Sequence, residues 1–177
     1  MTPADLYRTC SVSAWRLEVL QHYTVPGDEE RQRAFHAGEP LPPPGPGKLD
    51  SLALISRLRH AGRHVGRVHV VDRPLSAYIR YELAVYAENV AAGEDIRIAE
   101  RSLYPELESI TQDFTIFDEG TPQAVVVFFD YDDVGLVHGY RVADDAETVE
   151  RCRQQRELAF SRSVPLADFT AASLRAR

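Results

Sequence analysis

The order of apolar and polar residues predicts strands that alternate with helices in the middle of the chain. Residues 65–71 alternate as a strand, and residues 95–99 form a second short strand. Between them, apolar side chains recur every three or four positions, as on one stripe of a helix: Leu75, Ile79, Leu83, Tyr86 and Val90. Pro74 suits the first helical position, with Asp72 as a nearby cap. We therefore predict a βαβ unit with a parallel strand pair.

The second half of the chain predicts a run of antiparallel strands and a helix. Residues 113–118 (DFTIFD) and 124–130 (AVVVFFD) form strands, the latter buried on both faces. A turn leads to a strand over 136–142, and a C-terminal helix opens at Asp144 or Asp145 and reaches about Ser161. The fold class is α/β, with a mixed sheet, flanking helices, one βαβ unit and a β-hairpin or meander.

A proline-rich stretch divides the chain. Residues 40–47 (PLPPPGPG) hold five of the eleven prolines and predict a semi-rigid connector, with a PxxP ligand as the weaker reading. Residues 1–39 then form an N-terminal arm packed on the body, with a strand over 15–25 and a helix over 28–37. Residues 48–177 form the α/β body, opening with a helix over 49–61, and the whole is a single domain.

Composition and charge narrow the class of protein. The 177 residues carry 20 basic and 27 acidic side chains, and Lys48 is the only lysine. No stretch is apolar enough to span a bilayer and no signal pattern opens the chain, so we expect a cytoplasmic protein without membrane contact. Lys48 follows a Pro/Gly stretch, which makes it a poor platform for catalysis.

The charges are unevenly distributed. Residues 100–150 hold thirteen acidic and two basic residues, whereas residues 56–73 hold five arginines and one acidic residue, and residues 151–177 are also basic. The basic stretches are expected to neutralise the acidic one within the fold. The weaker alternative is nucleic-acid binding through Arg57, Arg59, Arg63 and Arg67.

Motifs for known chemistry are missing. The segment from Asp130 lacks an oxygen ligand at the fifth position of a calcium loop, and His60 and His64 do not form HExxH. GxSxG and GxGxxG do not occur, and the only Gly-Lys pair is not a phosphate-binding loop. We expect no metal and no cofactor, and the catalytic residues, if any, are unknown.

One group of polar residues remains as a candidate site. Arg73 precedes the predicted helix, where backbone N–H groups favour an anion, and Tyr78 lies one turn from Glu82. Asp113 and Asp118 bracket a strand whose two ends could approach the same sheet edge. The predicted ligand-binding residues are Arg73, Tyr78, Arg80, Glu82, Asp113 and Asp118. The alternative is that these residues only form ion pairs and caps.

An ordered set of phrases resembles a family of unknown function found in actinobacteria, mostly streptomycetes. The set is, in chain order, Arg16-Leu17-Glu18 with Tyr23 and Val25, Gly38-Glu39, RVHVV (67–71), Pro74 with Tyr78 to Glu82, Asn89 with AAGED (91–95), and DFTIFD. The family commonly has an aromatic residue where Thr115 stands and Trp where Ile98 stands. Its members are encoded near helix-turn-helix regulators, which implies such a regulator as a protein partner.

The strand order more distantly resembles half of a phospholipase D-type domain. The active members of that fold need His-x-Lys-x4-Asp, and Pro46 stands two positions before the only lysine. The resemblance therefore implies a catalytically silent relative.

These observations predict a non-catalytic binding or regulatory module that recognises a protein partner or a small anionic ligand. The alternative is a small pathway enzyme that uses Asp113, Asp118, Glu82 or Tyr78 as acid or base, without a metal. The identity of the ligand, the oligomeric state and the pathway are not encoded in any motif.

Overall fold

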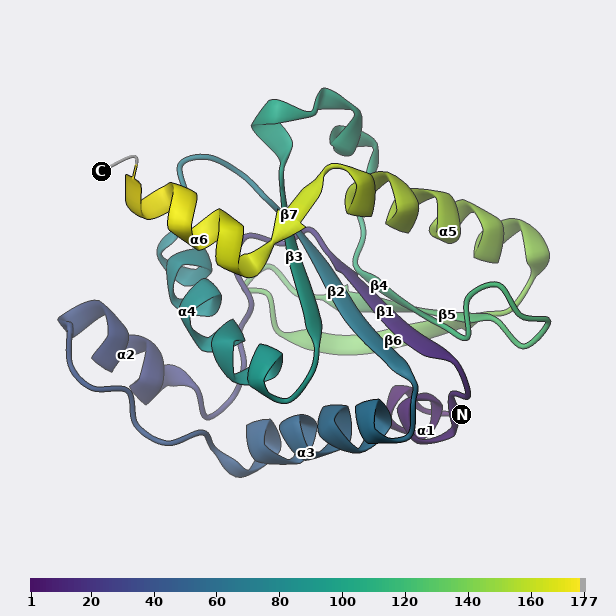
Figure 1. Cartoon of the computed structure of the whole chain (residues 1–177), viewed down its shortest axis with the longest axis horizontal. Coiled ribbons are helices and arrows are strands. Elements are labelled where there is room, and N and C mark those ends of the chain that lie inside the picture. Colours follow the sequence, from purple (N-terminus) through teal and green to yellow (C-terminus); the bar gives the residue numbers. More distant parts are fainter. Residues whose placement is uncertain (176–177) are drawn as a thin grey trace.

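A seven-stranded mixed β-sheet with helices on both faces forms the protein, as the α/β prediction states (Figure 1). The computed structural model describes residues 1–175. The strands are β1 (Ser13–Glu18), β2 (His64–Val71), β3 (Asp95–Glu100), β4 (Phe114–Phe117), β5 (Val125–Tyr131), β6 (Val137–Ala143) and β7 (Ser163–Pro165). The α-helices are α1 (Pro3–Thr9), α2 (Glu29–Ala37), α3 (Pro46–His60), α4 (Ala77–Ala91), α5 (Ala146–Ser161) and α6 (Leu166–Arg175).

The order of the strands in the sheet is β6-β5-β4-β1-β2-β3-β7. β1, β2 and β3 run parallel, and β2–α4–β3 is the predicted βαβ unit. β4, β5 and β6 form an antiparallel meander beside β1, and β7 pairs antiparallel with β3. Two short 3₁₀ helices, Arg101–Leu103 and Pro105–Ser109, connect β3 to β4.

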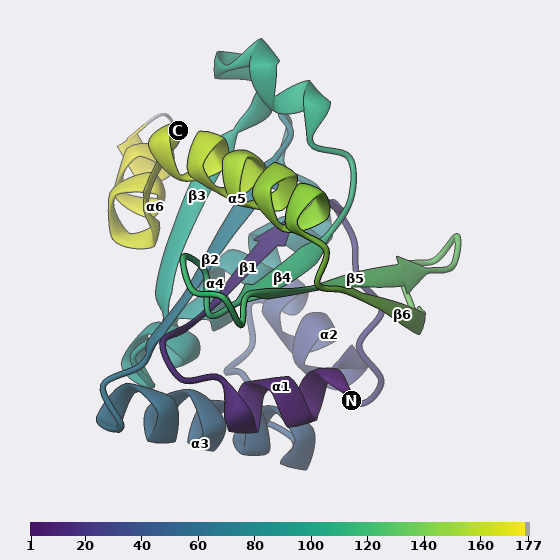
Figure 2. The same ribbon diagram turned by 90° about the vertical axis from the view of Figure 1, so that its right-hand side faces the viewer.

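The two faces of the sheet bury different side chains. Figure 2 shows α5 on one side of the sheet and α1 and α3 on the other. Trp15 and Leu17 of β1 face α5 and pack with Cys152 and Ala159 of that helix. On the opposite face, Ile79 of α4 packs in a separate buried cluster that includes strand β3. Within residues 1–175, no helix has the length and apolar character needed to cross a bilayer.

The segment 1–39 contributes the middle strand of the sheet. β1 lies between β2 and β4 and pairs with both along its length. The segment therefore forms part of the body, because its strand supplies the centre of the hydrophobic core. Its helix α2 begins after Asp28 and ends at Gly38, whose φ of 70° is left-handed, as the sequence predicts.

Several boundaries differ from the prediction. α4 begins at Ala77 rather than Pro74, because Ser76 caps it by accepting a hydrogen bond from the N–H of Ile79 at 3.0 Å. Val90 of the predicted stripe is exposed. α3 begins at Pro46 rather than at residue 49, so the last residues of the predicted connector and Lys48 form its first turn. No element was predicted after Ser161, where the structure has β7, which is too short to show an alternating pattern, and the helix α6.

Candidate functional site

A cavity of about 620 Å³ lies on the face of the sheet opposite α5. β1 and β2 supply its floor, α4 and the first turn of α3 supply one wall, and the β5–β6 hairpin supplies another. Residues from the N-terminal end of α1 and from the loop after β1 complete the lining. A volume of this size accommodates a small organic ligand.

Charged side chains form the floor of the cavity because of strand alternation. Arg16 and Glu18 of β1 point to the side opposite Trp15 and Leu17, which are in the α5-side core. The parallel register pairs Arg16 with Arg67 and Glu18 with His69 on β2. Four ionisable groups therefore meet on the two central strands.

Glu18 lies at the centre of this group and is 2 % exposed. Arg16 Nε is 2.8 Å from its Oε1, Arg67 Nη1 donates to its Oε2 at 2.9 Å, and the Tyr86 hydroxyl donates to Oε2 at 2.8 Å. Burial opposes ionisation, but the charges of Arg16 and Arg67 hold the pKa of Glu18 well below its usual value. Glu18 is therefore a fixed carboxylate that holds both arginines in place.

His69 connects Glu18 to Glu82 on α4. Its Nε2 is 2.9 Å from the carbonyl of Leu20, and its Nδ1 lies 3.3 Å from Glu82 Oε2. Burial lowers the pKa of His69, but the hydrogen bond and charge of Glu82, together with Glu18, raise it to about 9. His69 is thus an imidazolium that donates from both ring nitrogens.

Lys48 lies on the wall of the cavity, in the first turn of α3. Its Nζ donates to Asn89 Oδ1 at 2.5 Å, and Asn89 donates to Glu94 at 2.6 Å. Glu94 in turn accepts from Arg67 Nε at 3.0 Å. Burial and the nearby charge of Arg67 lower the pKa of Lys48. The only lysine is therefore a positioned part of the site.

Asp113 borders the cavity through two tyrosines. It accepts hydrogen bonds from the hydroxyls of Tyr23 at 2.6 Å and Tyr131 at 3.1 Å, and from the N–H of Val19 at 2.8 Å. Arg16 Nη2 donates to the Tyr131 hydroxyl at 3.2 Å. Burial, with the charge of Glu18, raises the pKa of Asp113. Asp113 therefore orients two rings of the wall.

Glu18, His69 and Glu82 bring three ligand-type atoms within 4.8 Å of one another, which is close enough for a metal ion. The Tyr86 hydroxyl, however, lies 2.8 Å from Glu18 Oε2 and 2.9 Å from His69 Nδ1, between the two ligand atoms. Arg16 and Arg67 already neutralise Glu18 and would repel a cation. The cluster fits an ion-pair network better than a metal centre.

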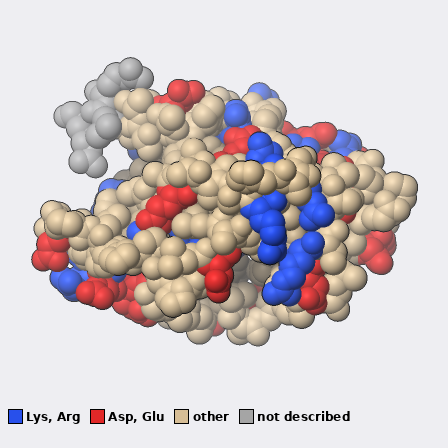
Figure 3. All heavy atoms as spheres, turned by 60° about the horizontal axis from the view of Figure 1, so that its bottom comes forward, with Lys and Arg blue, Asp and Glu red and all other residues tan. Residues whose placement is uncertain are grey.

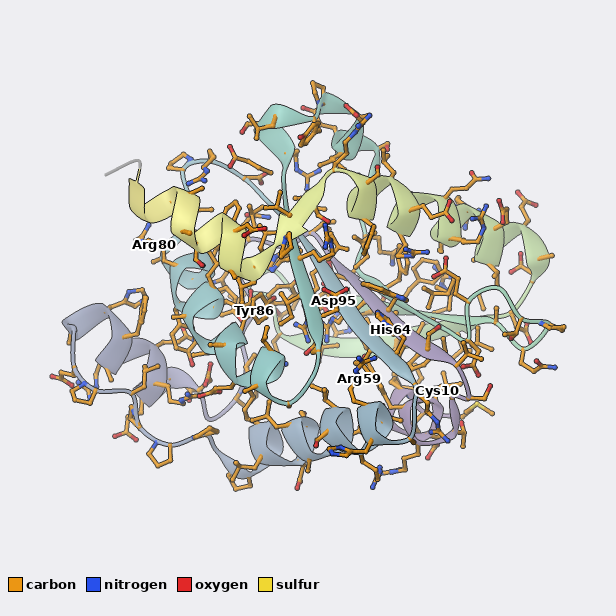
Figure 4. All side chains as sticks on the ribbon, in the orientation of Figure 1. Cys10, Arg59, His64, Arg80, Tyr86 and Asp95 are labelled. Carbon is orange, nitrogen blue, oxygen red and sulfur yellow. The ribbon has the colours of Figure 1, made fainter. Side chains whose placement is uncertain are left out.

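The structure separates the predicted site residues. Tyr78 and Glu82 line the cavity, where the Tyr78 hydroxyl donates to Glu82 at 3.2 Å, and Asp113 is reached only through Tyr23 and Tyr131. Arg80 lies on the outer side of α4, away from Tyr86, and donates to the carbonyl of Leu75 at 2.7 Å (Figure 4). The interpretation of Arg80 as a cavity ligand therefore does not fit its position.

Arg73 and Asp118 also lie away from the cavity. Arg73 lies three residues before Ser76, the N-cap of α4. Its side chain pairs with Glu100 at 2.9 Å and lies over the ring of Phe169. Asp118, at the end of β4 opposite Asp113, accepts N–H groups of Ser11 and Val12 at 2.8 and 2.7 Å. These backbone bonds lower its pKa against the effect of burial. It fixes the entry into β1.

Sequence reasoning missed the floor residues and Lys48. The available signal was the placement of charged residues at alternate positions within two strands that are otherwise apolar: Arg16 and Glu18 in one, Arg67 and His69 in the other. Such residues on a covered face must pair with one another or line a cavity. Arg67 was instead grouped with the exposed arginines by its position in the chain.

The basic and acidic segments do pair across the fold. Arg156 binds Glu119 and Arg162 binds Glu106, which links the basic C-terminal segment to the acidic one. Figure 3 shows basic side chains in a band beside acidic ones. Of the arginines considered for nucleic acid, Arg57 and Arg59 are exposed but Arg67 lies in the cavity. Arg67 is therefore set apart from the exposed arginines of α3.

Comparison with protein families identifies the chain. A family model described as a domain of unknown function (DUF6879) matches residues 2–171. The chain belongs to this family. No curated protein matches it. The resemblance to an uncharacterised family is thereby confirmed. The sequence segments that carry the resemblance can now be located in the DUF6879 domain. Arg16, Glu18 and Arg67 of these segments line the cavity floor, and Thr115 is the register partner of Arg16.

Proposed function

We propose that this protein is a non-catalytic binding module whose cavity takes a small anionic ligand. One observation carries the proposal. Arg16 and Arg67 are neighbours on the cavity floor, and each keeps one terminal nitrogen, Nη1 of Arg16 and Nη2 of Arg67, that donates no hydrogen bond to any residue in 1–175. Two adjacent guanidinium donors suit a carboxylate or phosphate group.

The two arginines are held in place before a ligand arrives. Glu18 binds both, Glu94 binds Arg67, and Tyr131 accepts from Arg16. Because their side chains are 25 % and 15 % exposed, little further ordering is needed when an anion binds. This pre-organisation supports binding as the function of the cavity.

The enzyme alternative has one supporting observation, the contact of Tyr78 and His69 with Glu82 in the cavity. Against it, burial and the charge of Glu82 raise the pKa of Tyr78, so its proton is not readily released. His69 is 1 % exposed and bonded through both nitrogens, which leaves it no position for a substrate. We therefore favour binding over acid–base catalysis.

The regulatory part of the proposal follows from the family resemblance. We propose that the protein is cytoplasmic, that its family is actinobacterial, and that a helix-turn-helix regulator is its partner. We also propose that its architecture is that of a phospholipase D-type domain without catalytic activity. Copurification of the two proteins from the native host, with and without added ligand, tests this part. A regulator that never copurifies would contradict it.

Isothermal titration calorimetry tests the binding function. Benzoate, cyclohexanecarboxylate and inorganic phosphate serve as probes for the wild type and for Arg16→Lys and Arg67→Lys, which keep a charge beside Glu18 but remove the free Nη atoms. We expect at least one probe to bind, and its Kd to rise about tenfold in both variants. Arg73→Lys and Arg80→Lys are matched controls outside the cavity and should leave Kd unchanged. Equal loss in the controls, or no binding of any probe, would contradict the proposal.

A further inference from the structure

Six of the eight tyrosines in the chain line this one cavity. Phe129 joins them, so the walls are aromatic well beyond the 9 % aromatic content of the chain. The six are Tyr23, Tyr78, Tyr81, Tyr86, Tyr131 and Tyr140. This many aromatic side chains around one cavity favour a ligand that packs against their rings.

Five of these tyrosines have their hydroxyl groups bound to carboxylates. Tyr78 donates to Glu82 and Tyr86 to Glu18, as described above, and Tyr81 donates to Asp28 at 2.7 Å. Tyr23 and Tyr131 share Asp113. Because their polar ends are occupied within the protein, these residues offer a ligand the faces and edges of their rings. The same bonds fix the ring orientations.

The rings meet at steep angles. The centroids of Tyr23 and Tyr131 are 5.5 Å apart with planes at 66°, and those of Tyr23 and Tyr78 are 5.8 Å apart with planes at 59°. Tyr78 and Tyr81 continue the series at 6.3 Å and 63°. Walls built in this way present both faces and edges, which is the geometry that a flat ring prefers for its neighbours.

An aromatic lining also suits a cation, but the charges on the floor oppose one. The carboxylates Glu18, Glu82 and Asp28 already accept hydrogen bonds from tyrosines, and Glu18 also binds two arginines. Among the charged groups of the floor, Nη1 of Arg16 and Nη2 of Arg67 donate to no partner within residues 1–175. A cation would approach these positive groups, whereas an acid group would pair with them.

We infer that the ligand is a planar aromatic acid, whose acid group binds Arg16 and Arg67 while its rings lie among the tyrosines. This inference rests on the proposed binding function and adds the chemical class of the ligand. A cavity of about 620 Å³ leaves room for a body of about two or three fused rings.

Calorimetry with three probes of one skeleton tests the inference: 2-naphthoate, its saturated counterpart decalin-2-carboxylate, and uncharged 2-naphthalenemethanol. We expect 2-naphthoate to bind about tenfold more tightly than either of the others. Tyr140 is 45 % exposed, so its replacement should not unfold the protein. Tyr140→Leu should weaken 2-naphthoate several-fold, whereas Tyr140→Phe, which keeps the ring, should bind it as the wild type does.

The outcomes separate the two claims. Equal affinity for the naphthoate and the decalin acid, with loss in Arg16→Lys, would overturn the aromatic inference and leave anion binding intact. Equal affinity for the naphthoate and the alcohol would overturn anion binding and leave the aromatic preference. No binding of any of the three would overturn both.

Discussion

Arg16 and Arg67 are register partners on adjacent parallel strands, and their guanidinium groups bind the same buried carboxylate, Glu18. Two like charges side by side on a covered sheet face are tolerable only because Glu18 lies between them in the network. The cavity floor is therefore a structural unit as well as a candidate ligand site. This double role governs the first prediction.

Replacing Glu18 by Gln should destabilise the fold strongly. The change leaves two buried arginines without their shared counter-ion, which costs about 3–5 kcal/mol when one partner of a buried ion pair is removed. Urea unfolding of the variant and the wild type measures the difference. Glu150→Gln, at an exposed position of α5, is the control and should change stability by less than about 0.5 kcal/mol. A cost below about 1 kcal/mol for Glu18→Gln would show that the network is not needed.

The imidazolium of His69 should make the protein less stable at alkaline pH. Its pKa is about 9 in the folded state against 6.5 in the unfolded chain. Because the folded pKa is the higher one, the stabilisation is complete below pH 6.5 and is lost as the pH rises through 9. The total is on the order of 3 kcal/mol.

Urea unfolding between pH 6 and 10 measures this loss. In His69→Gln, the free energy of unfolding should no longer fall as the pH rises from 6.5 through 9. NMR titration of the imidazole gives its pKa directly. A folded-state pKa at or below 6.5 would contradict the assignment of His69 as an imidazolium.

Gly66 should be irreplaceable on the opposite face of the sheet. A Cβ atom at this position would lie 2.3 Å from the ring of Trp15, which is in the α5-side core. Gly66→Ala should therefore cost about 1–3 kcal/mol through overpacking. Gly47→Ala is the control, because nothing lies within 4 Å of its Cβ position and Gly47 is in the first turn of α3. Equal stability of the two variants would contradict this packing.

Lys48 provides a reporter of the cavity because it is the only lysine in the chain. Reductive methylation with ¹³C-formaldehyde labels it, and its NMR signal should titrate with a pKa below the ordinary 10.5, since burial and Arg67 disfavour the charged amine. Binding of 2-naphthoate should shift the signal. The α-amino group, labelled at the same time, should titrate separately. If the Lys48 signal titrates with an ordinary pKa and does not shift when 2-naphthoate is added, Lys48 lies outside the site.

The sequence predicted the sheet better than the cavity. The βαβ unit and the strands of the meander follow from a regular apolar stripe and from alternating or apolar runs. The start of α5 follows instead from its cap, Asp145, which accepts a hydrogen bond from the N–H of Thr148. Tyr78 and Glu82 share the cavity because they lie one helical turn apart on α4. Arg73, Arg80 and Asp118 lie outside the cavity, because the start of α4 and the ends of β4 set their positions and spacing alone fixes neither.

The residues of the site come together through contacts between elements that lie far apart in the chain. Arg16 and Arg67 are separated by fifty residues and meet only through the β1–β2 register. Lys48 joins them because α3 begins at Pro46, inside the segment where the sequence predicted a semi-rigid connector. Six tyrosines from four parts of the chain gather for the same reason, since no local pattern announces which loops and strands share a cavity.

The most direct test of the central claim observes the guanidinium groups during binding. ¹⁵N-detected NMR of arginine side chains, assigned with Arg16→Lys and Arg67→Lys, follows the Nε and Nη signals as 2-naphthoate is added. The account predicts saturable shifts of Arg16 and Arg67 and none for exposed Arg57 of α3. Unmoved Arg16 and Arg67 signals, with shifts only at exposed arginines that do not saturate, would contradict it.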